Sequence, residues 1–320
     1  MSQRIVITVY HSIEEFSEPD PMITMGVFDG VHTGHRFMLQ VLQEKAKENG
    51  WTPLVITFWP HPRIVLNGSS EKLKYLTTLH EKLQLMEKQG IEHVLVLPFD
   101  ETVRNLTACD FVINLLAGRL KAKGLLMGFN HHFGKNRKGD YETIRKCTRN
   151  LNFHVERLEA VKKGEHQVSS TMIRDLLWSG EIEQAEKLLG YRYFITGMIV
   201  SGNKLGRNLG FPTANVQPFD EHKLLPRDGV YVAKAIISGR PFYGMLNVGI
   251  RPTLKDTLVK KTVEIHLFDF HGDIYGQDVR VSFLKRIRDE LTFENIDVLR
   301  NQLKKDRAIS LQWLNDRNLY

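Results

Sequence analysis

Two histidines three residues apart, in the stretch GVFDGVHTGH (26–35), are the first residues whose types and spacing suggest chemistry. An apolar segment expected to form a strand over 23–28 precedes them, and an amphipathic helix is expected after His35. A helix N-terminus beyond a strand offers backbone N–H groups and a positive dipole end to phosphate, and glycines at 26, 30 and 34 allow close approach. His32 and His35 could then donate to phosphate oxygens as charge builds up. The alternative is a tight turn with two exposed histidines.

A second candidate phosphate site is the stretch VSSTMIRD (168–175), which resembles the start of a helix. Ser169, Ser170 and Thr171 supply hydroxyls, and Arg174 lies three residues beyond Thr171. Hydroxyls, free N–H groups and a guanidinium together can hold a phosphate. The alternative is an N-cap on an ordinary helix.

A third candidate is the glycine-bearing basic stretch SGNKLGRNLGFPTANV (201–216). Its glycines at 202, 206 and 210, with Lys204 and Arg207 between them, could wrap phosphates through backbone N–H groups and side-chain charge. Thr213 and Asn215 offer two oxygen ligands of the kind that Mg²⁺ prefers. The alternative is a hairpin loop with turn glycines.

The elements that must position these residues follow two patterns. Over the first 160 residues, apolar strands expected at 5–9, 23–28, 54–58, 94–98, 124–127 and 153–155 alternate with helices expected at 37–47, 79–89 and 110–120, which predicts a doubly wound parallel sheet. A pair of short helices is expected over 168–190, ending at glycines 180 and 190. Strands then follow one another at 193–200, 230–237, 242–248, 262–268 and 279–283, before a helix at 294–303. This predicts an antiparallel barrel or sandwich. The boundary falls near 185–191, which gives domains of 1–187 and 188–320.

Composition narrows the class of partner. The net charge of +7, from 44 basic and 37 acidic residues, is modest, so small phosphorylated substrates are expected and nucleic acid is not. The first residues, MSQRIVITVYHS, carry no secretory signal, and no apolar run is long enough for a membrane span, so a cytoplasmic protein is expected. Cys109 and Cys147 are expected to be small buried apolar residues without a disulfide, as in a reducing compartment.

The motifs also resemble a known family. GVFDGVHTGH with SSTMIR looks like the nucleotidylyltransferase superfamily, and TFWPHP (57–62), LPFDETVRNLTACDFV (97–112) and GFNHHFGKNRKGD (128–140) are similar to blocks of prokaryotic FAD synthetases. In that family an FMN adenylyltransferase domain precedes a riboflavin kinase domain. The stretches 201–216, 229–235, 247–253, 263–276 and 283–306 resemble the kinase half in order and spacing.

The resemblance implies both architecture and roles. It implies a six-stranded Greek-key barrel in the second half, and synthesis of FMN and then FAD from riboflavin and ATP with Mg²⁺ bound by Thr213 and Asn215. Glu264 would be the base that acts on the ribityl hydroxyl, and oligomerisation is possible. Together with the phosphate-site residues above, the resemblance assigns catalysis to Glu264, His32, His35 and Arg174. It assigns ATP or phosphate binding to Gly26, Phe28, Asp29, Gly34, Ser169, Ser170, Thr171, Gly202, Lys204, Gly206 and Arg207. It assigns flavin binding to Asn130, Phe133, Arg288 and Glu290.

One segment departs from the family pattern. The family often has an aromatic residue and an arginine where this chain has His131 and His132, although Asn130, Phe133 and Gly134 fit. The two histidines could stack on a flavin or contact a phosphate, or be adjacent surface histidines. The alternatives to a bifunctional enzyme are therefore a chain with one active module, more readily the kinase, and a non-catalytic regulator that binds flavin or nucleic acid.

Overall fold

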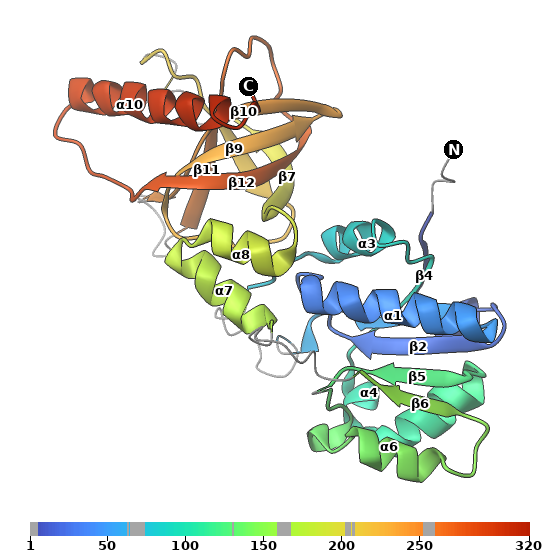
Figure 1. Ribbon diagram of the computed structural model, residues 1–320. Coiled ribbons are helices and arrows are strands. Elements are labelled where there is room, and N and C mark those ends of the chain that lie inside the picture. Colours follow the sequence, from blue (N-terminus) through green and yellow to red (C-terminus); the bar gives the residue numbers. More distant parts are fainter. Residues whose placement is uncertain are drawn as a thin grey trace. The chain divides into compact units, whose positions relative to one another are not determined.

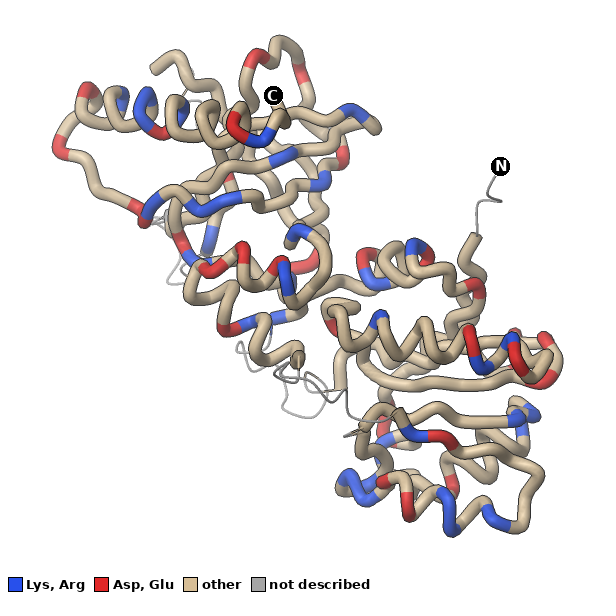
Figure 2. Tube along the Cα trace, in the orientation of Figure 1, with Lys and Arg blue, Asp and Glu red and all other residues tan. Residues whose placement is uncertain are grey.

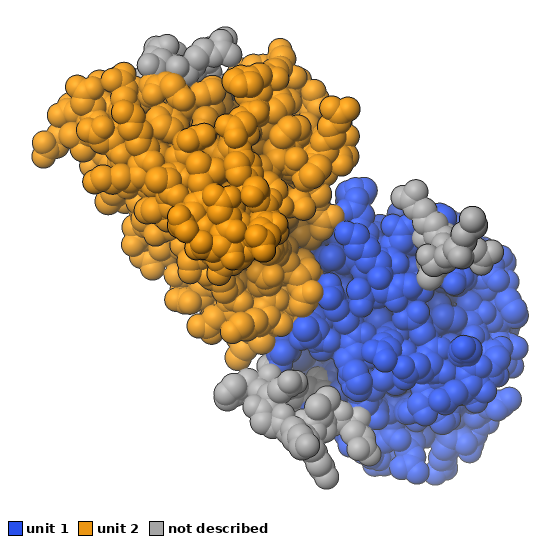
Figure 3. Space-filling model, turned by 45° about the horizontal axis from the view of Figure 1, so that its top comes forward, with its two compact units in different colours: residues 1–169 blue, residues 170–320 orange. Residues whose placement is uncertain are grey.

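The computed structural model describes residues 6–62, 64, 74–129, 131–158, 168–201, 206, 209–251 and 260–320. The chain divides into two compact units, residues 1–169 and 170–320 (Figure 3). Four predicted site residues, Asn130, Gly202, Lys204 and Arg207, lie outside the described residues.

The first unit is built on a six-stranded parallel sheet (Figure 1). Its strands lie in the order β1-β4-β3-β2-β5-β6. After β2 the chain adds β3 and β4 on one side and β5 and β6 on the other, so the order reverses between β2 and β5. The strands are β1 Thr8–Tyr10, β2 Pro21–Gly26, β3 Thr52–Phe58, β4 His93–Leu97, β5 Gly124–Met127 and β6 His154–Arg157. Ligands bind beyond the carboxyl ends of strands at such a reversal, and GVFDGVHTGH starts at that end of β2.

Helices cover both faces of this sheet. Helix α1 packs on β2 and β3, while Ile23 and Met25 of β2 point to the other face and pack with Phe111 and Ile144. Figure 1 shows α1 and α3 on one side and α4 and α6 on the other, which confirms the doubly wound arrangement. The helical elements are η1 Ile13–Glu15, α1 Thr33–Asn49, α3 Leu79–Glu87, α4 Glu101–Asn105, α5 Ala108–Asp110, the π-helix η2 Phe111–Arg119, η3 Lys135–Arg137 and α6 Tyr141–Thr148.

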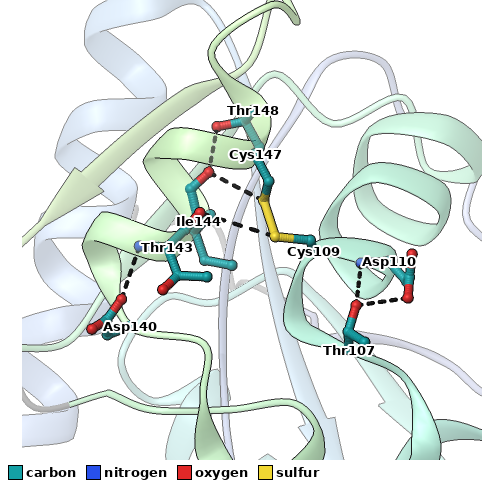
Figure 4. The surroundings of a disulfide bond; sticks show 8 residues. All are labelled: Thr107, Cys109, Asp110, Asp140, Thr143, Ile144, Cys147 and Thr148. Atoms are coloured by element: carbon teal, nitrogen blue, oxygen red, sulfur yellow. Dashed lines mark hydrogen bonds between the residues drawn. A yellow bond between two sulfur atoms is a disulfide. The ribbon is translucent and has the colours of Figure 1, made fainter.

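The expectation for the two cysteines was wrong. Cys109 of α5 and Cys147 of α6 form a disulfide with their Cα atoms 6.0 Å apart, and both are half-buried (Figure 4). The bond joins residues 38 apart in the sequence. In the chain-entropy account such a link stabilises a fold by about 4 kcal/mol. Single cysteines in two separate helices carry no pairing signal, because only the packing of α5 on α6 brings them together.

The second unit is a closed antiparallel barrel with helices before and after it (Figure 1). Its strands follow the order β10-β11-β8-β7-β12-β9, which confirms the predicted barrel. The elements are α7 Ser170–Ser179, α8 Ile182–Leu189, β7 Phe194–Val200, β8 Ala214–Pro218, β9 Gly229–Ile237, β10 Arg240–Arg251, β11 Lys260–Leu267, β12 Asp278–Arg288 and α10 Ile296–Asn315.

Two elements of this unit differ from the prediction. Strand β8 falls in a stretch that was expected to be a loop. Its sequence, ANVQP, is short and polar, and it forms a strand because it pairs with β7 and β11. Helix α10 begins at Ile296, capped by Asn295, and continues to Asn315, well beyond the predicted end at 303. Its Leu299, Leu303 and Leu314 belong to an apolar cluster with Val230 and Met245 of the barrel. One side of the barrel wall is thus covered.

Charges and hydropathy agree with a globular chain. Lys and Arg are interspersed with Asp and Glu along both units (Figure 2). Across the described part of the chain, every helix is too short or too polar to span a bilayer.

Candidate active sites

The loop between β2 and α1 is bent by backbone conformations that side chains rarely adopt. Phe28 has φ 50°, Gly30 φ 86° and Val31 φ 37°. A left-handed conformation at a non-glycine residue costs about 1–3 kcal/mol and is concentrated at functional sites. The buried Asp29 stabilises the bend, because its carboxylate accepts hydrogen bonds from the N–H groups of Leu76 and Thr77, both at 3.0 Å. Asp29 therefore organises the loop.

Helix α1 begins earlier than predicted and includes one of the two histidines. It starts at Thr33, not after His35, because His32 is its N-cap: the His32 Nδ1 accepts a hydrogen bond from the His35 N–H at 3.3 Å. The two rings stack with centroids 3.6 Å apart. A Cβ on Gly34 would lie 3.3 Å from the His32 ring, whereas one on Gly26 would meet Phe28 at an ordinary 3.4 Å. Of these two glycines, Gly34 is the one that makes room for the imidazole.

Both histidines are neutral at pH 7. Burial lowers the pKa of His32 to about 4, against an opposing effect of Asp29. Burial also lowers the pKa of His35 well below its usual value, and the neighbouring His32 and Lys82 lower it further. Since His32 Nδ1 accepts a hydrogen bond, its proton lies on Nε2. This imidazole can donate a hydrogen bond to an anion without carrying a positive charge.

The flavin-side segment predicted around Phe133 forms a small bridge against the core of the first unit. Phe133 pairs with Gly139, and its ring lies 6.1 Å from that of Phe111. His132 is exposed, whereas His131 is half-buried and burial lowers its pKa to about 4. Adjacent surface histidines therefore describe His132 but not His131. Contact of either histidine, or of Phe133, with a flavin remains a prediction.

The second phosphate motif does begin a helix, as predicted. Ser170 is the first residue of α7, Ser169 precedes it, Thr171 is exposed, and Arg174 is buried. The compact units divide between Ser169 and Ser170, so the two histidines lie in the first unit and Arg174 in the second. Joint action of this motif with His32 and His35 remains a prediction.

The barrel carries a pocket of about 290 Å³ that collects several predicted kinase residues. The Thr213 hydroxyl lies 3.4 Å from the Glu264 carboxylate inside it. Asn215 of β8 is the strand partner of Glu264 of β11, which places the predicted metal ligands beside the predicted base. Apolar walls come from both the barrel and α10. Gly206, Arg288 and Glu290 also line the pocket, together with Leu209, Phe211, Val230, Met245, Leu246, Leu291, Phe293, Leu299 and Leu303.

Glu264 illustrates why strand alternation alone was ambiguous. Its neighbours Val263 and Ile265 are buried on the opposite face of β11, as alternation predicts. Glu264 points away from them, but α10 and the residues around 290 cover that face. The carboxylate is therefore half-buried in a pocket instead of solvated.

Two polar residues of this pocket, and a third residue that binds its Arg288, were not singled out from the sequence. Asn247 donates to the Glu290 carboxylate at 3.4 Å and is the strand partner of Glu264. The ring of His266, two residues after Glu264 on β11, makes a 2.8 Å hydrogen bond with the carbonyl of Pro212. Asp306 of α10 is fully buried and binds Arg288 through contacts of 2.7–3.1 Å. Spacing of two along a strand could have indicated His266, but Asp306 becomes relevant only once α10 packs on the barrel.

The Arg288–Asp306 pair gives a stability prediction. The Arg288 side chain is 18% exposed and that of Asp306 is 0% exposed. Because Asp306→Ala leaves a largely buried guanidinium without its partner, we expect a loss of about 3 kcal/mol in the free energy of unfolding. Urea denaturation of the full chain measures this loss. The control is Asp297→Ala, whose partner Arg300 is 3.5 Å away on the exposed face of the same helix and whose loss should cost under about 0.5 kcal/mol. Equal stability of the two variants would contradict the prediction.

The chain therefore combines a parallel sheet, with the strained histidine loop at the point where the strand order reverses, and a closed β-barrel whose pocket holds the Glu264 carboxylate. Residues 15–172 match the family model of FAD synthetase, and residues 189–314 match that of riboflavin kinase. The bifunctional riboflavin kinase/FMN adenylyltransferase of Escherichia coli strain K12 is 35% identical over 95% of this chain and 96% of that protein. Its namesake from Bacillus subtilis strain 168 is 32% identical over 98% of both chains.

A solved structure supports the same fold over nearly the whole chain. It is described as a macrolide-efflux protein from Streptococcus pneumoniae, is 30% identical, covers 97% of this chain and 100% of that one, and superposes with a TM-score of 0.86. By its matches over both halves, this chain belongs to the family of bifunctional riboflavin kinases/FMN adenylyltransferases.

Proposed function

We propose that the chain makes FAD from riboflavin in two ATP-dependent steps, with residues 188–320 acting as the kinase and residues 1–187 as the adenylyltransferase. Family membership of both halves supports the two activities. The observation that carries the assignment of sites is the barrel pocket in which the Glu264 carboxylate meets the Thr213 hydroxyl beside apolar walls. A pocket with apolar walls and the Glu264 carboxylate beside a hydroxyl suits a flat isoalloxazine ring whose ribityl chain carries the reactive hydroxyl.

In the kinase step Glu264 accepts the proton of the 5′-hydroxyl of riboflavin. The hydroxyl oxygen then bonds to the γ-phosphorus of ATP, the bond from that phosphorus to the β–γ bridging oxygen breaks, and ADP leaves. Thr213 and Asn215 would hold Mg²⁺, since a hydroxyl and an amide oxygen beside a carboxylate are ligands that this ion prefers. When bound, the ion neutralises phosphate charge. Arg288, fixed by Asp306, and Glu290, held by Asn247, border the flavin.

In the adenylyl step a phosphate oxygen of FMN attacks the α-phosphorus of a second ATP, and pyrophosphate leaves. A phosphate is already a competent nucleophile, so the protein's contribution is positioning and charge stabilisation. His32 donates from Nε2, and the α1 N-terminus with Gly26, Phe28 and Gly34 accommodates the phosphates. Ser169, Ser170, Thr171 and Arg174 hold the departing pyrophosphate, and Phe133 borders the flavin.

The remaining proposals concern the binding partners and the cellular location of the protein. The partners are small molecules, with no nucleic acid or membrane, and self-association is compatible with the family. We place the protein in the cytoplasm, where ATP is available, and cell fractionation tests this.

One assay tests the proposal. The purified chain is incubated with riboflavin, ATP and Mg²⁺, and the flavins are separated by chromatography. We expect FMN and FAD. FMN without FAD would mean that only the kinase is active. If one module is inactive, we expect it to be the adenylyltransferase, because the departure from the family pattern at His131 and His132 lies in that half. If the chain converts neither riboflavin nor added FMN, it is a non-catalytic binding protein.

A further inference from the structure

Lys82 is a buried lysine beside the first phosphate site. It lies in the first turn of α3, after a capping box formed by Thr78 and Glu81, and the residue is only 1% exposed. Its Nζ donates to the Thr57 Oγ1 at 3.2 Å and lies 5.5 Å from the centre of the Trp59 ring. The ammonium is thereby fixed at the carboxyl end of β3.

This lysine is tied to the loop that carries the histidines. The Thr57 Oγ1 that accepts from Lys82 donates its own proton to the carbonyl of Val27, at 3.2 Å. Val27 precedes the strained turn, so one hydroxyl links the ammonium to the backbone of the phosphate loop. Lys82 is also close enough to His35 to lower the pKa of that imidazole.

Lys82 has no ion-pair partner among the residues that the structure describes. Among the described residues, the charged or titratable groups of neighbouring elements that interact electrostatically with Lys82 are Asp29, in the loop after β2, and His35, in α1. Asp29 already accepts hydrogen bonds from Leu76 and Thr77. On its own helix, Glu81 accepts from the N–H of Thr78 at 3.0 Å.

A buried ammonium without a carboxylate partner is costly, and an apolar side chain would pack at this place without that cost. The cost is offset if the charge serves a ligand. Phosphates bring several negative charges to this edge of the sheet, and the two histidines are neutral and supply none. A fixed cation in a low-dielectric setting acts on such charges more strongly than one in water.

We propose that Lys82 is a positioning residue for adenylyl transfer: its ammonium, fixed by Thr57 and Trp59, supplies the positive potential that favours the substrate phosphates at the His32–His35 loop. The proposal rests on the adenylyltransferase function proposed above. Lys82 acts through the loop and through space, because its ammonium is buried and bonded to Thr57.

The pH dependence follows from the same geometry. Burial lowers the pKa of Lys82 to about 8, against an opposing effect of Asp29. The group is therefore charged below pH 8 and loses its charge as the pH rises through 8. His35, with its pKa far below its usual value, is already neutral there. The rate of FAD formation should therefore fall above pH 8, which gives the pH profile an alkaline limb. The riboflavin kinase reaction of the same chain should not show this fall.

The test compares Lys82→Met, Lys82→Arg and the control Lys47→Met, which removes an exposed lysine of α1. FMN-to-FAD rates are measured from pH 6 to pH 9.5. A thermal melt of each preparation reports that the first unit is folded, and riboflavin phosphorylation is the internal activity control. We expect Lys82→Met to lower kcat/KM for FAD formation by about 10- to 100-fold and to lose the alkaline limb. Lys82→Arg should recover most of the rate and move the limb to higher pH, and Lys47→Met should match the wild type.

Wild-type kinetics in Lys82→Met, or a wild-type profile that is flat through pH 8, would overturn the proposal for Lys82 while leaving the adenylyltransferase function intact. If Lys82→Met fails to fold, the wild-type profile and Lys82→Arg still decide. A wild-type chain that forms no FAD from FMN at any pH would overturn the proposed function itself, and the role of Lys82 with it.

Discussion

Glu264→Gln is expected to slow riboflavin phosphorylation by about 10²- to 10⁴-fold, the usual contribution of a general base, and to leave FMN adenylylation unchanged. The carboxylate is half-buried in the barrel pocket, 3.4 Å from the Thr213 hydroxyl, and glutamine keeps its shape but cannot accept the proton. The measurement is the rate of FMN formation from riboflavin under saturating ATP, alongside FAD formation from added FMN by the same preparation.

A matched control is Glu294→Gln, which removes an exposed carboxylate from the same unit. It should keep both rates within about twofold of the wild type, as expected for a surface substitution. A wild-type kcat in Glu264→Gln would exclude this residue as the base. A parallel loss of FAD formation in a folded variant would contradict the independence of the two sites.

The second large effect is expected at the histidine pair. Replacing His32 and His35 together with alanine should lower FAD formation from FMN by at least about 100-fold, because the loop loses the hydrogen-bond donors that face developing charge. Riboflavin phosphorylation should be unaffected, since the barrel pocket contains neither residue. Loss of both activities would mean that the reactions do not use separate sites.

The capping role of His32 must be separated from its chemical role. The alanine variant also removes the acceptor for the His35 N–H, a loss of about 1 kcal/mol for an N-cap. His32→Asn preserves a capping oxygen but removes the imidazole donor, so it should melt like the wild type and still form FAD slowly. If His32→Asn forms FAD at the wild-type rate, His32 serves only as the helix cap and not as a hydrogen-bond donor in the reaction.

Much of the architecture was predictable because its signals are local. Alternating apolar segments and amphipathic helices up to residue 160 predicted the parallel sheet, and successive strands after 191 predicted an antiparallel barrel or sandwich, of which the structure has the barrel. Side-chain periodicity arises within a few neighbouring residues, so a single sequence displays it. The exceptions, such as the strand at Ala214–Pro218, acquire their structure from partners that are distant in the sequence.

The candidate sites divide in the same way. Glycine-bearing loops, paired histidines and the Thr213–Asn215 spacing are local patterns, and the sequence alone determined where phosphate-handling sites should be sought. The sequence could not show that His32 caps α1, that Cys109 meets Cys147, or that Asp306 binds Arg288. These interactions join groups whose proximity is produced by folding.

Lys82 is the extreme case. In LTTLHEKLQLMEKQG it is one lysine of an amphipathic helix and resembles a solvated surface residue. Only the packing of α3 beside β3 and the phosphate loop buries its ammonium against Thr57 and Trp59. Sequence determined which residue types could do chemistry and in which order. Tertiary structure decided which charges are buried and what they face, because burial depends on elements brought together across the chain.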